Sequence, residues 1–530
     1  MKRHLIFLLA MLPMLFTAKA AEIKVDSVGK LETQLPDSIR FTIAQLKVSG
    51  PLNGKDMKLL QQIVTRTKTN KKNPDECLVT SVDLSEAIIV EGKEGLETKN
   101  GVLPASLFSG AKSLQTVILP QALIGIGKSC FEDCESLTNF TLPESLKIIE
   151  ANAFEDCKAI TTMTIPTGVR MLEADAFKDC TSLSSVTLPE DLTIIGNEAF
   201  YGCKLLTNVV IPKYVREIGN GAFKNCTALA NIQMEDVNTI GSNAFEGCTS
   251  LSSVTLKNIA KMGVSAFEGC TALSTVNLDG PLGELSNDAF KKCTSLSSIT
   301  IPGSVKAFGN EVFYECKTLP AITLPDGLTK IDARAFQGCS SLKEVSIPNL
   351  VISIGSSAFE DCSSLDNVAI NGYIKEISNH MFRLCHSLRT VSIPNSVGKI
   401  NTKAFQGCSS LADITLPPAL TSISDDAFAK CSSLTSLSIP AAVKEIGSSA
   451  FEECVMLSSV ELPSGLKKIG GSAFAKCVSL KTVVLNSPAP PTISKSTFKG
   501  TAPTFLIPRG SLTIYMANKD WKNISGFKEK

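Results

Sequence analysis

Residues that carry catalytic chemistry are scarce in this chain of 530 residues, which has three histidines, five tyrosines and one tryptophan. Only His380 and His386 lie beyond the first 20 residues, so only these two could be the base of a Ser-His-Asp triad. Neither accompanies the Gly-x-Ser-x-Gly motif that positions a nucleophilic serine. The sequence also lacks a phosphate loop and a complete dinucleotide-binding glycine motif. We therefore predict that the protein is not an enzyme and needs no cofactor, with a hydrolase as a remote alternative.

An excess of charge of either sign is also absent. The chain has 52 Lys and Arg against 51 Asp and Glu, and charged residues make up only 19% of it. Removing the first 20 residues takes away three basic residues, which leaves 49 basic against 51 acidic residues and a net charge near −2. A dedicated binder of nucleic acid or anionic membranes would show a basic patch or stripe. We expect no nucleic-acid partner.

Long apolar runs are missing except at the start of the chain. There, Lys2 and Arg3 precede the apolar residues 5–16, and Ala18-Lys19-Ala20 supplies the small residues of a cleavage site. This order is typical of a secretory signal peptide, and the run is too short and too early for a permanent membrane span. We predict a signal peptide over residues 1–20, a mature chain without an integral membrane span, and a secreted, cell-surface or periplasmic location.

What the chain has instead is a repeat. Phenylalanine returns every 22 to 24 residues across nearly four fifths of the sequence. The series consists of Phe108, Phe131, Phe154, Phe177, Phe200, Phe223, Phe245, Phe267, Phe290, Phe313, Phe336, Phe359, Phe382, Phe405, Phe428, Phe451, Phe474 and Phe498. A fixed period of this length indicates stacked units, each of which buries its apolar face only against its neighbours. The sequence therefore predicts a solenoid with a long surface and no obvious deep pocket.

Sixteen of the 18 cysteines occupy one position of this repeat, three residues after phenylalanine. In an exported protein, so many cysteines would ordinarily suggest disulfides. Here they should line up on rungs about 4.8 Å apart with parallel side chains, which is poor geometry for a disulfide. We expect buried thiols that act as small hydrophobic residues. Cys130 should also lie in the core, whereas Cys77 lies outside the ladder and its pairing is not predicted.

The rung at residues 180–203 shows how one repeat should fold. Val186 and Leu188 alternate with polar residues, as in a short strand with one buried side. Pro189 follows, and because it has no N–H to give to a strand ladder, it should close the strand and turn the chain. Gly196 permits a second turn. Proline recurs at this position twelve times, at residues 120, 143, 166, 189, 212, 302, 325, 348, 394, 417, 440 and 463.

The sequence suggests one possible metal site, which would bind zinc. Two histidines and a thiolate can bind zinc, and His380, Cys385 and His386 lie close together in the sequence. Cys385 belongs to the cysteine ladder and should point inward, whereas both histidines fall at positions expected to face outward. We therefore expect no metal site.

The complete motif, Cys-x-x-Leu-x-x-Val-x-Leu-Pro-x-x-Leu-x-x-Ile-Gly-x-x-Ala-Phe, resembles the repeat of BspA-like, or treponemal-type, leucine-rich repeat proteins over about residues 102–500. The proline after the strand and the lack of an asparagine ladder distinguish it from the general leucine-rich motif. The resemblance implies an α/β solenoid, a right-handed array of about 17 repeats of 22–24 residues with a parallel β-sheet on the concave face and a cap at both ends. It also implies a bacterial secreted or surface protein, since relatives are known as adhesins for host extracellular proteins.

The N-terminal end departs from the repeat. Residues 41–48 have a strand pattern, and a helix pattern with one apolar face begins after Asn53-Gly54. We predict that residues 21–100 form an N-terminal cap domain, because an exposed solenoid end requires a polar outer face. A separate binding domain is the functional alternative.

The C-terminal end changes at the proline-rich residues 486–491. A strand is predicted near residues 504–508, and Ser511 could cap a short helix that leads to Trp521. We predict a solenoid over residues 101–500 and a C-terminal cap over residues 501–530. The cap should pack Trp521 against the last rung rather than offer it to a ligand.

The rungs between residues 226 and 282 are irregular. Two cysteine intervals shrink to 22 residues there, and proline is missing after three successive strands. Structural drift is one explanation, and a section adapted to a ligand is another. The outward strand positions in and near this section are neutral hydroxyl and amide residues, which also suit an exposed strand without a ligand. The candidate ligand-binding residues on the concave face are Asn208, Asn231, Gln233, Thr255, Thr275, Asn277 and Thr300.

Three functions remain open from the sequence. The leading hypothesis is a secreted or cell-surface recognition protein without catalytic activity, which binds host or bacterial surface proteins or glycans along the solenoid in an adhesin-like manner. A structural or spacer protein of the bacterial envelope is the alternative, since an array also sets a distance. A hydrolase is the remote alternative. The sequence does not identify the ligand, the oligomeric state or a means of attachment.

Overall fold

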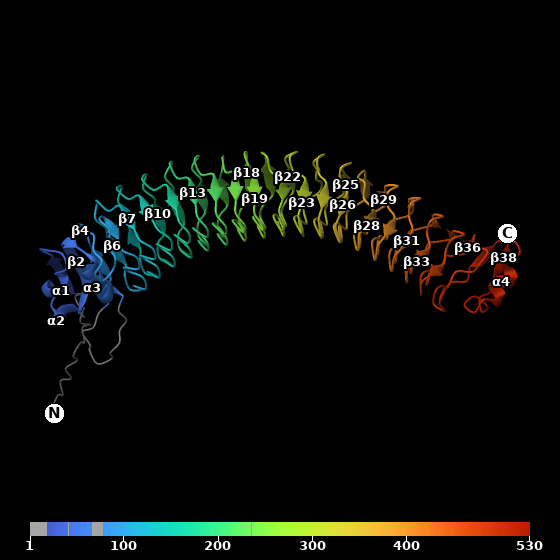
Figure 1. Cartoon of the computed structure of the whole chain (residues 1–530), viewed down its shortest axis with the longest axis horizontal. Coiled ribbons are helices and arrows are strands. Elements are labelled where there is room, and N and C mark those ends of the chain that lie inside the picture. Colours follow the sequence, from blue (N-terminus) through green and yellow to red (C-terminus); the bar gives the residue numbers. More distant parts are fainter. Residues whose placement is uncertain (1–18, 41, 66–77, 235) are drawn as a thin grey trace, which may run out of the picture. The chain divides into compact units, whose positions relative to one another are not determined.

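The computed structural model describes residues 19–40, 42–65, 78–234 and 236–530 (Figure 1). The chain divides into two compact units, residues 1–169 and 170–530. In each unit, short parallel strands stack from rung to rung, and one rung is one repeat. The described part has about 22 turns, more than the 17 repeats predicted, because end segments add parallel turns of their own. The predicted leucine-rich-repeat solenoid with parallel sheets is confirmed.

Most rungs of the second unit contribute a first strand of three or four residues and a second strand of two residues, while residues 320–324 and 411–417 form no first strand. The first strands are β12 (Ser185–Thr187), β14 (Asn208–Val210), β16 (Asn231–Gln233), β18 (Ser253–Leu256), β20 (Thr275–Leu278), β22 (Ser298–Thr300), β25 (Glu344–Ile347), β27 (Asn367–Ile370), β29 (Thr390–Ser392), β32 (Ser436–Ser438), β34 (Ser459–Leu462) and β36 (Thr482–Leu485). The second strands are β11 (Met171–Leu172), β13 (Ile194–Ile195), β15 (Glu217–Ile218), β17 (Thr239–Ile240), β19 (Lys261–Met262), β21 (Glu284–Leu285), β23 (Ala307–Phe308), β24 (Lys330–Ile331), β26 (Ser353–Ile354), β28 (Glu376–Ile377), β30 (Lys399–Ile400), β31 (Ser422–Ile423), β33 (Glu445–Ile446) and β35 (Lys468–Ile469).

The first unit begins with elements that precede the repeat and then enters it. Its strands are β1 (Lys19–Lys24), β2 (Ile43–Leu52), β3 (Ser81–Asp83), β4 (Ala87–Ile89), β5 (Val102–Leu103), β6 (Thr116–Ile118), β7 (Gly125–Ile126), β8 (Asn139–Phe140), β9 (Ile148–Ile149) and β10 (Thr162–Thr164), and its helices are α1 (Leu31–Gln34), α2 (Asp37–Arg40) and α3 (Gly54–Val64). Strands β1, β2, β3, β6 and β8 form one parallel sheet in that order. The non-repeat segment therefore continues the strand ladder of the solenoid.

Helix α3 starts where the sequence predicts it. The Asn53 side chain accepts hydrogen bonds from the N–H groups of Lys55 and Asp56, and the Asp56 carboxylate accepts one from the N–H of Asn53. This reciprocal capping box satisfies N–H groups that a helix start leaves without partners. Strand β2 runs four residues past the predicted end at residue 48. Strand β1 includes Lys19 and Ala20, while the rest of the predicted signal peptide and Cys77 lie outside the described residues.

Proline closes the first strand of a rung as predicted. The carbonyl of each of the twelve repeated prolines accepts a hydrogen bond from the N–H three residues later, as Pro189 does from Leu192 at 3.1 Å. In two rungs where proline is missing, the residue in its place donates an N–H to the preceding rung and extends the ladder. The N–H of Asp279 donates to the carbonyl of Leu256 at 2.8 Å, and the N–H of Asn371 donates to the carbonyl of Ile347 at 3.1 Å. Strand length does not depend on this proline alone, since β16 without it has three residues, whereas β25 and β34, which precede it, have four.

The third side of each rung is a turn wall, which we define as the residues from two before to three after the repeated phenylalanine. The residues two before and two after phenylalanine have positive φ in most rungs, for example Asp175 at 57° and Asp179 at 53°. The alternation turns every second N–H toward the next rung. The N–H groups of Asp175, Phe177 and Asp179 donate to the carbonyls of Asn197, Ala199 and Tyr201 at 2.7–2.9 Å. The turn wall is thus a third ladder, in which these main-chain N–H groups all donate to the following rung.

The core is a stack of phenylalanine rings and thiols. From Phe177 to Phe498, consecutive rings stack with centroids 5.1–5.8 Å apart. The 17 cysteines of the described residues are all buried and remain as thiols, Cys130 included. The prediction that the cysteine ladder consists of buried thiols is confirmed.

The C-terminal end contains the predicted strand and helix and one further strand, namely β37 (Thr504–Ile507), α4 (Leu512–Ala517) and β38 (Phe527–Glu529). Ser511 precedes α4 but makes no side-chain capping hydrogen bond. Trp521 is fully buried, and its indole N–H donates to the carbonyl of Pro491 at 2.7 Å. The Tyr515 hydroxyl donates to the main-chain carbonyl of Ser487 at 2.8 Å. Both large aromatic residues are therefore bonded to the proline-rich segment, and Trp521 also lies 6.2 Å from the Phe498 ring of the last rung, against which it was predicted to pack.

Candidate functional site

The strand face consists of the outward positions of β14, β16, β18, β20 and β22. Six of the seven candidate residues on it are exposed, and Thr275 is half-buried. Their register follows the strand pairing, which places Asn208 opposite Asn231, Val210 opposite Gln233, Thr255 opposite Asn277, and Asn277 opposite Thr300. The structure thus brings the candidates into rows, although β16 and β18 belong to separate sheets.

Hydrogen bonds on the strand face run between side chains of neighbouring rungs. The Asn231 amide donates to Asn208 Oδ1 at 3.1 Å, and the Thr300 hydroxyl donates to Asn277 Oδ1 at 3.4 Å. These groups offer neutral donors and acceptors to a ligand. Aromatic and arginine side chains, which anchor many protein interfaces, do not occur among the seven candidates. Ligand binding by these residues stays a prediction.

A break in the strand ladder follows this face. In regular rungs, the residue at this position donates its N–H to a carbonyl of the preceding rung, as Ser297 does to the carbonyl of Ser274 at 2.9 Å. Pro320 occupies the same position in its own rung. Proline has no such N–H, and residues 320–324 form no strand. The short Ala321 beside it lies in a hollow of about 800 Å³, which Ser298, Asp326, Glu344 and other polar residues also line. No pattern in the sequence indicates this hollow.

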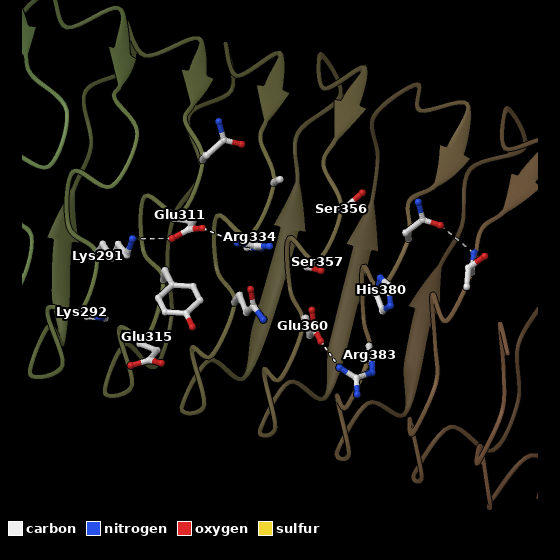
Figure 2. Close-up of a pocket in the computed structure, with 16 residues that line it drawn as sticks. Lys291, Lys292, Glu311, Glu315, Arg334, Ser356, Ser357, Glu360, His380 and Arg383 are labelled. Carbon is white, nitrogen blue, oxygen red and sulfur yellow. Dashed lines mark hydrogen bonds and ion pairs between the residues drawn. The ribbon is translucent and has the colours of Figure 1, made fainter. Parts of the chain in front are cut away.

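A larger groove lies on the turn wall, and we call it the turn-face groove (Figure 2). It has a volume of about 1050 Å³ and crosses successive rungs from Lys291 to Thr402. Figure 2 shows Ser356 and Ser357 between Arg334 on one side and His380 on the other. The short side chains of Ala333, Ser356 and Ser357 leave the space that longer residues fill in neighbouring rungs.

Two groups of charged side chains border the turn-face groove. The Glu311 carboxylate forms ion pairs with Lys291 and Arg334, each with a nitrogen-to-oxygen distance of 2.8 Å (Figure 2). Burial alone would raise the pKa of Glu311, but the hydrogen bonds from these two cations lower it below its usual value. At the other end, Arg383 pairs with Glu360 at 2.5 Å. The cations are thus held in place by carboxylates and keep further N–H donors for a ligand.

The groove also contains neutral groups of the kinds that anchor ligands. Burial lowers the pKa of His380, so its imidazole is neutral near pH 7. Tyr314 lines the groove close to the Lys291 ammonium, which lies 5.9 Å from the ring centroid. A phenol, an imidazole and two guanidinium groups therefore lie within the same groove.

Backbone donors add to this set. In several rungs an asparagine three residues before phenylalanine accepts the N–H of the corresponding residue in the next rung. Asn287 does so for Asn310 at 2.7 Å, and Asn379 does so for Thr402 at 3.2 Å. Ala333 has no side-chain acceptor to offer Ser356 in the same way. The floor of the groove therefore presents a main-chain N–H where other rungs have an internal hydrogen bond.

The histidines and Cys385 are not brought together as a metal site. The Cys385 thiol points into the core and donates to the carbonyl of Phe359 at 3.1 Å. The His386 ring bonds through Nδ1 to the carbonyl of Gly407 at 3.0 Å. Within the described ranges, no group of three or more His, Cys, Asp or Glu side chains is placed to hold a metal ion.

Fold and surface together define a leucine-rich-repeat solenoid with polar surfaces along its rungs. The family model for the BspA type leucine rich repeat region matches residues 101–226, 193–320, 283–412 and 375–505. The chain belongs to this family.

Several solved structures are similar to the chain. A leucine-rich repeat protein from Bacteroides ovatus is 25% identical, with 85% of this chain and 92% of that chain covered and a TM-score of 0.47. A leucine rich cell surface protein from Faecalibacterium prausnitzii is 27% identical, with 61% and 85% covered and a TM-score of 0.37. The leucine rich repeat protein of T. pallidum is 23% identical, with 39% and 77% covered and a TM-score of 0.26. No curated protein matches the chain.

Family membership sets the broad class of function. Leucine-rich repeat surface proteins are typically non-catalytic and bind other proteins, and BspA-like relatives are cell-surface proteins. In the ranges that the structure describes, no helix combines the length and the apolar character needed to cross a membrane.

Proposed function

We propose that the protein is an exported, adhesin-like recognition protein without catalytic activity, which binds a surface protein or a glycan along its rungs. The turn-face groove is the observation that carries this proposal. It is open and crosses several rungs, so it fits a long ligand that contacts one rung after another. A site for catalysis on a small substrate would instead enclose the reacting atoms and exclude water.

The side chains of the turn-face groove favour it over the strand face as the main binding surface. Binding energy at protein interfaces concentrates in tyrosine, tryptophan and arginine side chains. Tyr314, Arg334 and Arg383 supply two of these three types, and Figure 2 shows Arg334 and Arg383 on opposite sides of the serines. The seven strand-face candidates offer only neutral amides and hydroxyls, which suit weaker or multivalent contacts.

The test compares two matched double variants of residues 21–530. In the groove variant, Arg334→Ala is combined with Arg383→Ala; in the strand-face variant, Asn231→Ala is combined with Asn277→Ala. Each protein is measured against a panel of extracellular-matrix proteins, serum proteins and glycans by biolayer interferometry at two salt concentrations. We expect saturable binding of at least one panel member that the groove variant weakens by about tenfold or more, while the strand-face variant retains it.

Three other outcomes would change the proposal. Loss of binding only in the strand-face variant would transfer the site to the strand face. Binding that moderate salt abolishes would indicate nonspecific attraction of surface charge. No saturable binding to any panel member, together with tight association to the bacterium's own envelope, would favour the spacer function.

A further inference from the structure

The C-terminal end of the turn wall differs from every rung before it. From Phe177 to Phe474, the N–H of each repeated phenylalanine donates to a carbonyl of the following rung, as Phe474 does to Thr497 at 2.9 Å. The N–H two residues later behaves likewise, as Lys476 does to Lys499 at 2.8 Å. Phe498 and Gly500 hold these two positions in the last rung, and among the described residues no further rung supplies the carbonyls. Their N–H groups therefore point out of the end of the wall.

A pocket of about 720 Å³ lies at this end of the wall, and we call it the C-terminal pocket. Its volume is in the range of pockets that enclose a small ligand. Phe498, Phe505 and Ile524 give it apolar walls, and Phe505 is almost fully buried. The residues of the cap, which prevent another rung from stacking here, leave this space beside the Phe498 ring.

Charge in the C-terminal pocket is mainly positive. Lys495, Lys499 and Lys519 line it, and Asp520 is the acidic residue among its lining residues. All three lysines are exposed, and none forms an ion pair within the described part of the chain. The Phe498 N–H at the end of the wall and the lysine ammonium groups together attract an anion.

We propose that the C-terminal pocket binds a carboxylate that is attached to an apolar group. The carboxylate accepts hydrogen bonds from the Phe498 N–H, takes the place of the absent carbonyl of a following rung, and lies within reach of the lysine ammonium groups. The apolar group packs against Phe498, Phe505 and Ile524. Such a ligand is either a free carboxylic acid or the C-terminal residue of a peptide, because both present the same chemistry.

The single tryptophan of the chain reports on this pocket. Trp521 lies with its ring centroid 6.2 Å from that of Phe498 and 5.6 Å from that of Phe505. Its fluorescence is measured on residues 21–530 during titration with 3-phenylpropionate, 3-phenylpropionamide, acetyl-Ala-Ala-Phe and acetyl-Ala-Ala-Phe-amide. We expect a saturable change with one or both acids and none with the matching amides. The acid that binds more tightly identifies the source of the carboxylate.

Two variants complete the experiment. Lys499→Gln should weaken the binding of the acids by about tenfold, because a charge-assisted contact is lost. Lys522→Gln serves as the matched control, since Lys522 adjoins Trp521 in the sequence but does not line the pocket. An equal response to acids and amides would overturn the proposal, as would an absence of any response or equal effects of the two variants. None of these outcomes bears on the turn-face groove.

Discussion

The thiol of Cys203 donates a hydrogen bond to the main-chain carbonyl of Phe177, one rung earlier, over 3.2 Å. The turn wall sends the N–H groups of alternate residues forward, and the phenylalanine carbonyl accepts the N–H of the cysteine in its own rung, as Phe177 does from Cys180 at 3.3 Å. The same bond recurs along the second unit, with sulfur-to-oxygen distances of 3.1–3.3 Å up to Cys477 and Phe451. Cysteine is thus both a small apolar residue and a second donor to this buried carbonyl.

Replacing one thiol in the middle of the ladder tests this second role. Cys316→Ala removes the thiol donor from the Phe290 carbonyl, which keeps the N–H of Cys293 at 3.1 Å, so the variant should lose about 0.5–1.5 kcal/mol of local stability. Cys316→Ser keeps a donor, so it should be at least as stable as Cys316→Ala. Amide hydrogen exchange in the rungs around residue 316 gives the local free energies. If the serine variant is clearly less stable than the alanine variant, the thiol acts only as a hydrophobic residue.

Alkaline pH should destabilise the solenoid through its thiols. Burial raises the pKa of Cys248, Cys339 and Cys431 from 9.0 to about 12. Because the folded-state pKa is the higher one, stability is fully present below about pH 9 and is lost as the pH rises toward 12. Each such thiol lowers the free energy of unfolding by up to about 1.4 kcal/mol for every pH unit of this interval.

The measurement is urea unfolding between pH 8 and pH 11, with thiolate absorbance followed in the same samples. We expect thiolates to form only when the protein unfolds, and the urea midpoint to fall as the pH rises. Gradual thiolate formation near pH 9 in folded protein would contradict the burial of the ladder.

The phenylalanine stack should supply much of the stability of each rung. Phe313 is fully buried and stacks on Phe290 and Phe336 with centroids 5.8 and 5.3 Å away. Phe313→Ala should therefore cost about 3–5 kcal/mol. Thr300→Ala, at an exposed strand position, should change stability by no more than about 0.5 kcal/mol. Denaturant unfolding of both variants makes the comparison, and similar losses would show that the assigned register is wrong.

The break at Pro320 should be repairable. Pro320→Ser restores an N–H opposite the Ser297 carbonyl, so residues 320–324 should join the strand ladder and their amides should exchange more slowly with solvent. Ala321→Ser is the control, because it changes the neighbouring side chain and leaves the backbone as it is. Equal exchange in the two variants would mean that proline is not the cause of the break.

The repeat made most of the fold predictable. Phe, Cys, Leu and Pro recur at fixed positions because each fills the same place in the core or closes the same turn, so period and residue type together specify a rung. The positive φ angles of the turn wall left no comparable signal. Asp179, Gly202, Glu315 and Leu384 all adopt them at the same position, since the ladder between rungs rather than residue type holds that conformation.

The surfaces were predictable only in part. Alternation along the strands correctly placed Asn208, Asn231 and Asn277 outward, and strand pairing put them in register. The turn-face groove was missed because it arises from residues that depart from their neighbours. Ala333 and Ser356 are short at a position where Asn287, Asn310 and Asn379 are not. A comparison of outward positions from rung to rung would have detected this signal.

The single direction of the turn-wall hydrogen bonds has a consequence for how such a chain changes over generations. In the turn wall, every interior rung gives alternate N–H groups to the rung after it and accepts those of the rung before, so any interior rung can be lost or duplicated whole while its neighbours find equivalent partners. The reach of the molecule can therefore change in steps of one repeat without a redesign of the interior. The outward positions are free to vary independently, so length and binding specificity can evolve separately.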